Sequence, residues 1–133
     1  MAKISRDDLK VRGFKRFLKS FKYSIEGLLY AYRYEQSMFI HMIFVILVIT
    51  LNIVLKVGAT NWLFTMLMLV VTLAAELINT AIEAVVDLVT LEIHPLAKIA
   101  KDCSSAATFV LSISSIVLAL FIYVPKVIEV LGL

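Results

Sequence analysis

Apolar runs of membrane-spanning length dominate the chain beyond residue 35. Three stretches hold no Asp, Glu, Lys or Arg: Gln36–Leu55 with 20 residues, Val57–Ala75 with 19 and Cys103–Pro125 with 23. A helix needs about 20 mostly apolar residues to cross a bilayer. The pattern therefore predicts an all-α membrane protein with transmembrane helices at about 36–55, 61–89 and 96–124.

The middle helix is expected to be longer than the bilayer is thick. Turn and capping residues occupy Lys56–Asn61, and nothing after them breaks a helix until about Val89. Such a helix would be about 40 Å long at about 1.5 Å per residue, whereas the hydrocarbon core is about 30 Å thick. Its last turns should therefore leave the core. The following helix should begin near Pro95, which suits a first helical turn, and end at Pro125-Lys126.

Residues 5–30 show a different pattern, with an apolar and a basic side. Ser5, with an acid three residues later, has the form of a helix N-cap. The apolar side holds Leu9, Phe14, Phe17, Leu18, Phe21, Ile25 and Leu28, and the basic side holds Lys10, Arg12, Lys15, Arg16, Lys19 and Lys22. This pattern is typical of an amphipathic helix lying in the headgroup plane. The alternative is a solvent-exposed helix packed on a partner protein.

Composition and charge agree with a membrane location. The chain is 62% hydrophobic with a mean hydropathy of +0.98, against about 45–50% apolar residues in soluble domains. Residues 1–35 carry nine of the 13 basic residues and four of the 10 acidic ones. Such a basic segment favours anionic lipid headgroups over nucleic acid and predicts a cytoplasmic N-terminus. The single cysteine, Cys103, excludes an internal disulfide, and the lack of a His/Cys cluster disfavours zinc or iron–sulfur chemistry.

Four polar side chains recur on one face of the middle helix. Glu76, Asn79, Glu83 and Asp87 follow one another at spacings of 3, 4 and 4 residues. At about 3.6 residues per turn they share one narrow side of the helix. Carboxylates on a largely apolar helix are costly and need partners or a function. Because no His/Cys set accompanies them, they favour a hard cation bound through oxygen, such as Mg²⁺.

These acids suggest a division of roles along the helix. Glu83, together with Glu35 from the adjacent helix, is a candidate Mg²⁺ ligand. Glu76 lies about 10 Å deeper along the axis and suits a general base. The sequence has no glycine-rich phosphate loop and no soluble-kinase motif, so Lys98, Lys101 and the basic N-terminal helix would have to meet any phosphates. A polar helix-packing network and an ion or proton path are the alternatives from the residues alone.

Two segments around the acidic face read E-L-I-N-T-A-I-E-A-V-V-D (Glu76–Asp87) and E-I-H-P-L-A-K-I-A-K-D (Glu92–Asp102). Together they resemble the signature of the prokaryotic diacylglycerol kinases, which are small integral-membrane lipid kinases. The resemblance extends upstream to Arg16, Tyr23, Gly27 and Glu35 and covers nearly the whole chain. The form H-P-L-A-K (His94–Lys98) is similar to the Gram-positive branch, whose members phosphorylate undecaprenol.

The resemblance implies roles for the matching positions. Glu76 matches the proposed catalytic base, while Glu35 and Glu83 match the Mg²⁺ ligands. Positions near the nucleotide are Arg16, Tyr23, Asn79, Asp87, Glu92, His94, Lys101 and Asp102, and positions near the lipid are Arg16, Glu76 and Ser105, with the Arg16–Ile25 region. The family also implies a homotrimer with active sites shared between subunits. A bacterial cell-membrane location is expected as well, and the basic bias before the first span places the active site on the cytoplasmic side.

Some positions carry no expectation or depart from the family's pattern. Phe39 stands where many relatives have Arg, and Ser105 replaces a more usual Gly or Ala. His41, one to two turns inside the first predicted span, is assigned no role.

The sequence as a whole predicts one integral-membrane domain over residues 1–133. The predicted activity is an ATP- and Mg²⁺-dependent lipid kinase acting on undecaprenol. A diacylglycerol kinase that makes phosphatidic acid is the alternative within the same class. A small ion or proton transporter and a purely structural membrane subunit are alternatives from other classes.

Overall fold

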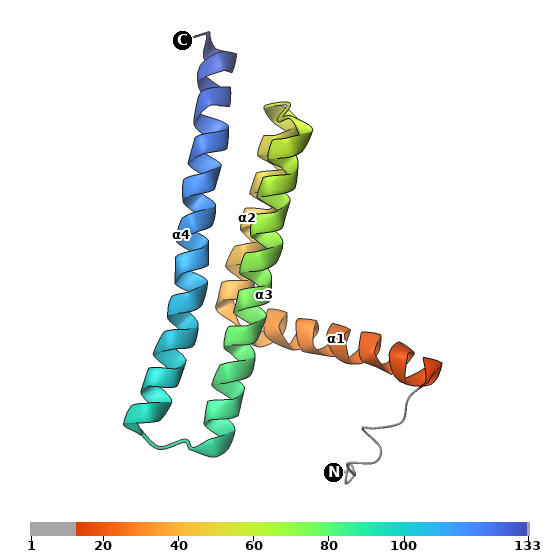
Figure 1. The fold of residues 1–133 in the computed structure, drawn as a ribbon, viewed down its shortest axis with the longest axis vertical. Coiled ribbons are helices and arrows are strands. Elements are labelled where there is room, and N and C mark those ends of the chain that lie inside the picture. Colours follow the sequence, from red (N-terminus) through yellow and green to blue (C-terminus); the bar gives the residue numbers. More distant parts are fainter. Residues whose placement is uncertain (1–12, 133) are drawn as a thin grey trace. The chain divides into compact units, whose positions relative to one another are not determined.

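The computed structural model describes residues 13–132, apart from the side chain of Lys15, and this part of the chain forms four α-helices. They are α1 (Phe14–Tyr34), α2 (Gln36–Val54), α3 (Ala59–Val89) and α4 (Pro95–Leu131) (Figure 1). The chain divides after Tyr34 into two units, with α1 in the first and the other three helices in the second. The all-α prediction is confirmed for the described residues.

Three of the helices are long and apolar enough to cross a membrane. They are α2 with 19 residues, α3 with 31 and α4 with 37, with mean hydropathies of 2.4, 1.8 and 2.3 in their most apolar windows. Many of their large apolar side chains are exposed, including Ile46, Leu67 and Phe109. An apolar surface of this extent suits lipid tails or other membrane helices. The prediction of three candidate spans is therefore confirmed by length and composition.

The observed helix ends differ from the predicted ones at several places. α3 begins at Ala59, two residues before the predicted start, and α2 ends at Val54, one residue before its predicted end. The prediction that the last helix ends at Pro125-Lys126 is wrong, because α4 continues through Pro125 to Leu131. A proline lacks an N–H and crowds the preceding turn, but a long apolar helix tolerates it where neighbouring groups compensate.

The end of α4 is stabilised by local contacts beyond the proline. Lys126 Nζ lies 2.7 Å from Glu129 Oε2, one turn along the helix. Gly132 adopts a left-handed conformation with φ of 69°, and its N–H donates to the Glu129 carbonyl at 3.3 Å. A left-handed glycine is a common helix terminator. The glycine, rather than the proline, therefore marks the end of the helix.

The first helix, α1, matches the predicted 5–30 segment over its described part. It runs to Tyr34, four residues beyond the predicted end. The predicted N-cap at Ser5 lies outside the described residues. Phe17 and Phe21, one turn apart, contact each other edge to face with ring centroids 5.0 Å apart and stay exposed. The amphipathic character of α1 and its position at the membrane surface both stay predictions.

Polar side chains link the three helices of the second unit at the end where α2 turns into α3. Asn52 on α2 is completely buried and donates from Nδ2 to Thr65 Oγ1 on α3 at 2.9 Å. The Tyr123 hydroxyl on α4 donates to Asn52 Oδ1 at 3.0 Å. Around this network lies a small apolar cluster that includes Val57 and Ile122. Because buried polar groups need partners, this network fixes how the three helices face one another.

A second polar contact crosses between α3 and α4 nearer the middle of the bundle. The hydroxyls of Thr72 and Ser115 lie 3.1 Å apart. The hydroxyl of Ser115 on α4 therefore takes part in helix packing. Thr108, another hydroxyl residue of α4, bonds to the Ser105 carbonyl within its own helix instead. Such a hydroxyl bond to the preceding turn satisfies the group without a partner helix.

Candidate active site

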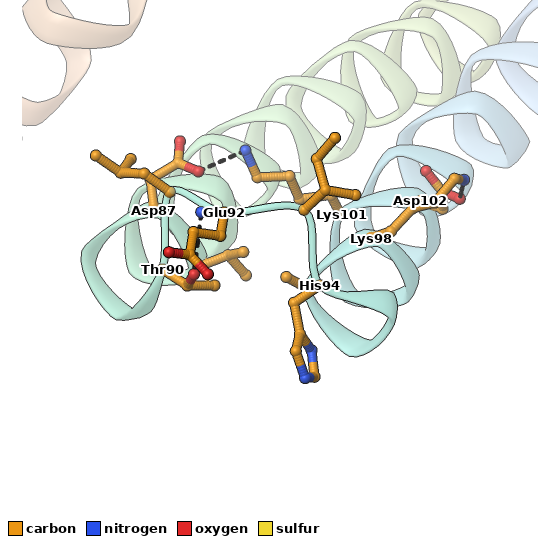
Figure 2. A pocket seen from close by; sticks show the side chains of 11 residues that line it. Asp87, Thr90, Glu92, His94, Lys98, Lys101 and Asp102 are labelled. Carbon is orange, nitrogen blue, oxygen red and sulfur yellow. Dashed lines mark hydrogen bonds and ion pairs between the residues drawn. The ribbon is translucent and has the colours of Figure 1, made fainter.

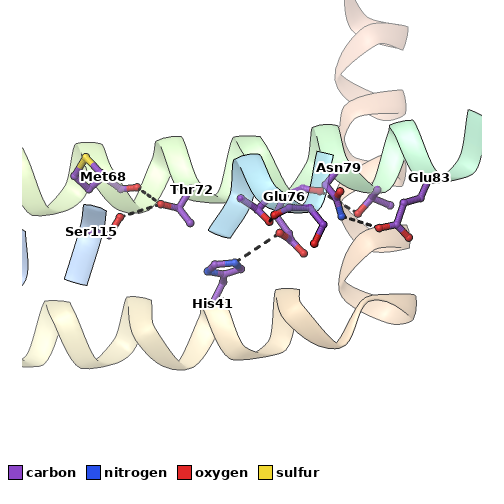
Figure 3. A network of polar contacts seen from close by, with 10 residues as sticks. His41, Met68, Thr72, Glu76, Asn79, Glu83 and Ser115 are labelled. Carbon is purple, nitrogen blue, oxygen red and sulfur yellow. Dashed lines mark hydrogen bonds and ion pairs between the residues drawn. The ribbon is translucent and has the colours of Figure 1, made fainter. Parts of the chain in front are cut away.

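The predicted acidic face of α3 runs from the interior of the bundle to the exposed end of the helix. Glu76 and Asn79 are buried, Glu83 is half-buried and Asp87 is exposed. Their side chains follow one another along one side of α3, as Figure 3 shows for the first three. The 3, 4 and 4 spacing produces this arrangement because α3 is an unbroken helix throughout. The polar face therefore extends from the buried carboxylate of Glu76 to the solvent-exposed carboxylate of Asp87.

The deepest acid, Glu76, faces a histidine from the neighbouring helix. His41 on α2 places Nε2 4.0 Å from Glu76 Oε2, and the two side chains are 16% and 8% exposed (Figure 3). The backbone carbonyl of Glu76 accepts a bond from Thr80 Oγ1 at 3.1 Å. No role was predicted for His41 from the sequence, and no motif could have identified this pairing, because it joins positions 35 residues apart.

The next pair, Asn79 and Glu83, brings two kinds of oxygen together. Asn79 Nδ2 donates to Glu83 Oε1 at 2.9 Å (Figure 3). This leaves Asn79 Oδ1 buried without a hydrogen-bond partner. A buried amide oxygen without a partner is uncommon and calls for an explanation. An amide oxygen beside a carboxylate is a donor set suited to a hard cation such as Mg²⁺ or Ca²⁺.

The structure does not complete that donor set from protein atoms. Within residues 13–132, no three His, Cys, Asp or Glu side chains come together as a metal site. Glu35 stands at the N-cap position of α2, and its carboxylate makes no capping bond. A Mg²⁺ ion commonly takes only one or two protein carboxylates and fills its remaining positions with water and phosphate oxygens. The residues present therefore fit an ion that a phosphate ligand helps to hold.

At the end of α3 an ion pair connects the acidic face to α4. Lys101 Nζ lies 2.6 Å from Asp87 Oδ1 (Figure 2). Both side chains keep contact with solvent, with 37% and 49% exposure. On the same part of α4, Lys98 and Asp102 form a second, more exposed ion pair. The two lysines thus lie close to carboxylates at the same end of the bundle.

A pocket of about 310 Å³ lies in this region, where α3 ends and α4 begins. Figure 2 shows its polar side chains around the connecting loop. The polar residues that line it are Asp87, Thr90, Glu92, His94, Lys98, Lys101 and Asp102. The pocket is open and its charged lining holds three carboxylates and two lysines, so a polar ligand suits it better than an apolar one.

The loop beside this pocket is shaped by local hydrogen bonds. The Glu92 N–H donates to Thr90 Oγ1 at 3.1 Å, and the Leu96 N–H donates to His94 Nδ1 at 3.2 Å. His94 is thus the N-cap of α4, and Pro95 follows in the first turn, as predicted. The cap uses Nδ1 and leaves Nε2 of His94 available to a ligand.

The structure therefore gathers some of the predicted site residues and separates others. Five of the predicted nucleotide positions line the pocket, and they are Asp87, Glu92, His94, Lys101 and Asp102. Asn79, Glu83 and Glu76 follow along α3 toward the interior. Arg16 and Tyr23 lie on α1 in the other unit, and Ser105 is exposed on α4. The chemical roles assigned to all of these residues stay predictions.

Comparison with known proteins gives consistent matches. Residues 22–123 match the family model described as prokaryotic diacylglycerol kinase. The chain is 34% identical over 111 residues to an undecaprenol kinase of Bacillus subtilis (strain 168), which covers 84% of this chain and 90% of that protein. It is 40% identical over 98 residues to a diacylglycerol kinase of Pseudomonas aeruginosa, with 74% and 80% covered. A diacylglycerol kinase of Helicobacter pylori (strain 26695) is 38% identical over 101 residues, with 76% and 79% covered.

Proposed function

Since the chain belongs to the prokaryotic diacylglycerol kinase family and is a multi-pass membrane lipid kinase, we propose that it transfers the γ-phosphate of ATP, with Mg²⁺, to the hydroxyl of undecaprenol. The observation that carries this proposal is the continuous polar face of α3. It leads from buried Glu76 to Asp87 at the rim of the α3–α4 pocket. A lipid hydroxyl and a hydrated nucleotide can meet along such a face.

Glu76 is the general base in this proposal. Its carboxylate is largely removed from water, which suits contact with a hydroxyl that arrives from the apolar part of the membrane. It accepts the proton of that hydroxyl while the oxygen attacks the γ-phosphorus of ATP. The bond from phosphorus to the β–γ bridging oxygen breaks, and ADP leaves toward the aqueous side. The products are the lipid phosphate and ADP.

Glu83, Asn79 and Glu35 would hold the magnesium ion, and the nucleotide's phosphates would supply its other oxygen ligands. Support comes from the partnerless Oδ1 of Asn79 beside Glu83 and from the carboxylate of Glu35, which makes no capping bond to α2. When bound, Mg²⁺ supplies positive charge that offsets the charge of the phosphates. Asn79 serves two purposes here, since its amide nitrogen also orients the Glu83 carboxylate.

The α3–α4 pocket binds the nucleotide. Lys101 offsets negative charge on the transferring group, because phosphoryl transfer depends mainly on positioning and electrostatics. Asp87 holds the Lys101 ammonium near the rim until the phosphates arrive. His94, Glu92 and Asp102 contribute polar groups around the nucleotide. Arg16 and Tyr23 are assigned to the same ligand by family resemblance, as are Arg16 and Ser105 to the lipid.

Undecaprenol is preferred over diacylglycerol as the acceptor. The B. subtilis relative, which is an undecaprenol kinase, aligns with 84% of the chain, whereas the P. aeruginosa diacylglycerol kinase aligns with 74% at a higher identity. The His94–Lys98 segment also has the form of the undecaprenol branch. Diacylglycerol remains the second candidate, supported by that higher identity.

The enzyme works as a homotrimer in the bacterial cell membrane, with its N-terminus and active site in the cytoplasm. The basic residues before α2 support this orientation through the positive-inside rule. The extensive exposed apolar surface of α2, α3 and α4 supports contact with other subunits as well as lipid. In this arrangement α1 lies along the cytoplasmic membrane surface.

The decisive experiment uses purified protein with labelled ATP, Mg²⁺ and each of the two lipids. Wild-type protein should phosphorylate undecaprenol with a larger kcat/KM than diacylglycerol. This order is expected whether or not diacylglycerol is phosphorylated at a measurable rate. Glu76→Gln should lower kcat by about 100-fold or more while ATP binding stays within about twofold. Retained turnover in this variant would refute the role of Glu76. A larger kcat/KM for diacylglycerol would refute the lipid assignment alone.

A further inference from the structure

The buried carboxylate of Glu76 lies near a basic side chain from the neighbouring helix. His41 reaches it across the α2–α3 interface with Nε2 4.0 Å from Oε2 (Figure 3). Both side chains are mostly buried. Buried polar groups of this kind are rarely placed beside each other without consequence, because each would otherwise face an apolar surrounding without a partner.

The geometry distinguishes the two oxygens of the carboxylate. Oε2 is the oxygen of Glu76 that faces the imidazole, so Oε1 is left for another ligand. A separation of 4.0 Å is longer than a hydrogen bond. A hydrogen bond between them requires the two atoms to approach to about 3 Å.

The surroundings of His41 place it at the boundary between this acid and an apolar space. His41 also lines a groove of about 260 Å³ between α2, α3 and α4. The groove is lined mainly by apolar side chains, including Phe44, Leu69 and Ile116. Glu76 is not among its lining residues. The imidazole therefore has apolar side chains on one side and the carboxylate on the other.

We propose that His41 is a positioning residue for Glu76, which rests on the proposed function in which Glu76 is the general base. Its Nε2–H donates to Glu76 Oε2 and fixes the carboxylate, so that Oε1 points to the lipid hydroxyl. A glutamate side chain has several rotatable bonds, and a misplacement of about 1 Å at a reacting group can lower a rate about 100-fold. His41 itself does not touch the lipid or the nucleotide in this role.

A packing role predicts something different. Any side chain of similar size and polarity would fill the same space, and the position of its donor would not matter. The distinction can be tested with two amides that differ by one methylene group. The amide nitrogen of glutamine reaches about as far as Nε2 of histidine, whereas that of asparagine stops near the position of Nδ1.

The experiment compares His41→Gln with His41→Asn in the full-length enzyme, using whichever lipid the wild type phosphorylates. His41→Gln should keep kcat within about threefold of wild type, and His41→Asn should lower kcat at least about tenfold. The KM for ATP should change less than twofold in both, because the nucleotide pocket lies elsewhere. Thermal unfolding should be similar for the two variants.

Thr72→Val is the matched control. Thr72 lines the same groove one turn from Glu76 and bonds to Met68 and Ser115, not to the acid. This variant should keep kcat within about twofold of wild type. Equal kcat values for His41→Gln and His41→Asn, at any level, would overturn the proposal. So would a loss in Thr72→Val as large as that in His41→Asn.

Failure of this inference can be told apart from failure of the proposed function. An active wild type and an inactive Glu76→Gln variant, with equal rates for the two His41 variants, would remove the role of His41 and leave the base intact. A Glu76→Gln variant with wild-type turnover would remove the base itself, and with it the reason to position it.

Discussion

Lys101 on α4 and Asp87 near the end of α3 form an ion pair, with Nζ 2.6 Å from Oδ1. The two residues come from different helices and meet at the rim of the α3–α4 pocket. Surface ion pairs of this kind contribute little to stability. The position of the pair at the rim of a polar pocket is therefore better explained by the proposed function than by folding.

Lys101→Met should lower kcat by about 100-fold, because it removes the ammonium charge that offsets the negative charge of the transferring phosphate. The expected change in thermal unfolding is small. Lys126→Met is the matched control, since Lys126 also pairs with an acid on α4 but lies at the opposite end of that helix. It should leave kcat unchanged. Equal kcat values for the two variants, measured with labelled ATP and lipid, would contradict a role for Lys101 in the reaction.

Asn79→Ala should raise the Mg²⁺ concentration needed for half-maximal activity by about tenfold. The substitution removes the partnerless Oδ1 and the amide that orients Glu83. The measurement is lipid phosphorylation as a function of Mg²⁺ at saturating ATP. Thr80→Ala, which alters the adjacent buried position, should leave that concentration unchanged. An unaltered Mg²⁺ dependence in Asn79→Ala would remove the assignment of this oxygen to the metal.

His94→Asn should raise the KM for ATP several-fold and leave the stability of the protein close to wild type. Asparagine is a good N-cap and can still accept the Leu96 N–H that His94 Nδ1 accepts now. It cannot present a group where Nε2 of His94 lies. His94→Ala should show the same rise in KM and also lose about 1 kcal/mol of stability. A normal KM for ATP in both variants would place His94 outside the nucleotide site.

Tyr123→Phe should destabilise the helix bundle by about 0.6 kcal/mol, and at most about 1.7 kcal/mol. The change removes the hydroxyl that bonds to buried Asn52. Unfolding in detergent micelles measures the effect, and Ser114→Ala, which removes only a bond to its own helix, is the control. Lipid kinase activity should stay close to wild type, because this network lies at the end of the bundle opposite the α3–α4 loop (Figure 1). A large loss of activity without a loss of stability would contradict a purely structural role.

The sequence by itself determined the three candidate spans and the acidic face. Uncharged runs of about 20 residues can satisfy their backbone in a bilayer only as helices. The spacing of Glu76, Asn79, Glu83 and Asp87 then follows from the period of the helix, so their shared face needed no tertiary information. The family was also readable from those residues, and the comparisons confirm it.

Only the tertiary structure decided which groups meet across helices. The pairs His41–Glu76 and Asp87–Lys101 depend on how the helices are rotated against one another, which periodicity alone does not specify. The continuation of α4 past Pro125 was likewise visible only in the structure, because a long apolar helix can tolerate the backbone bond that a proline removes. The spacing of residues thus determined which side chains share a helix face, and helix packing determined which partners those side chains meet on other helices.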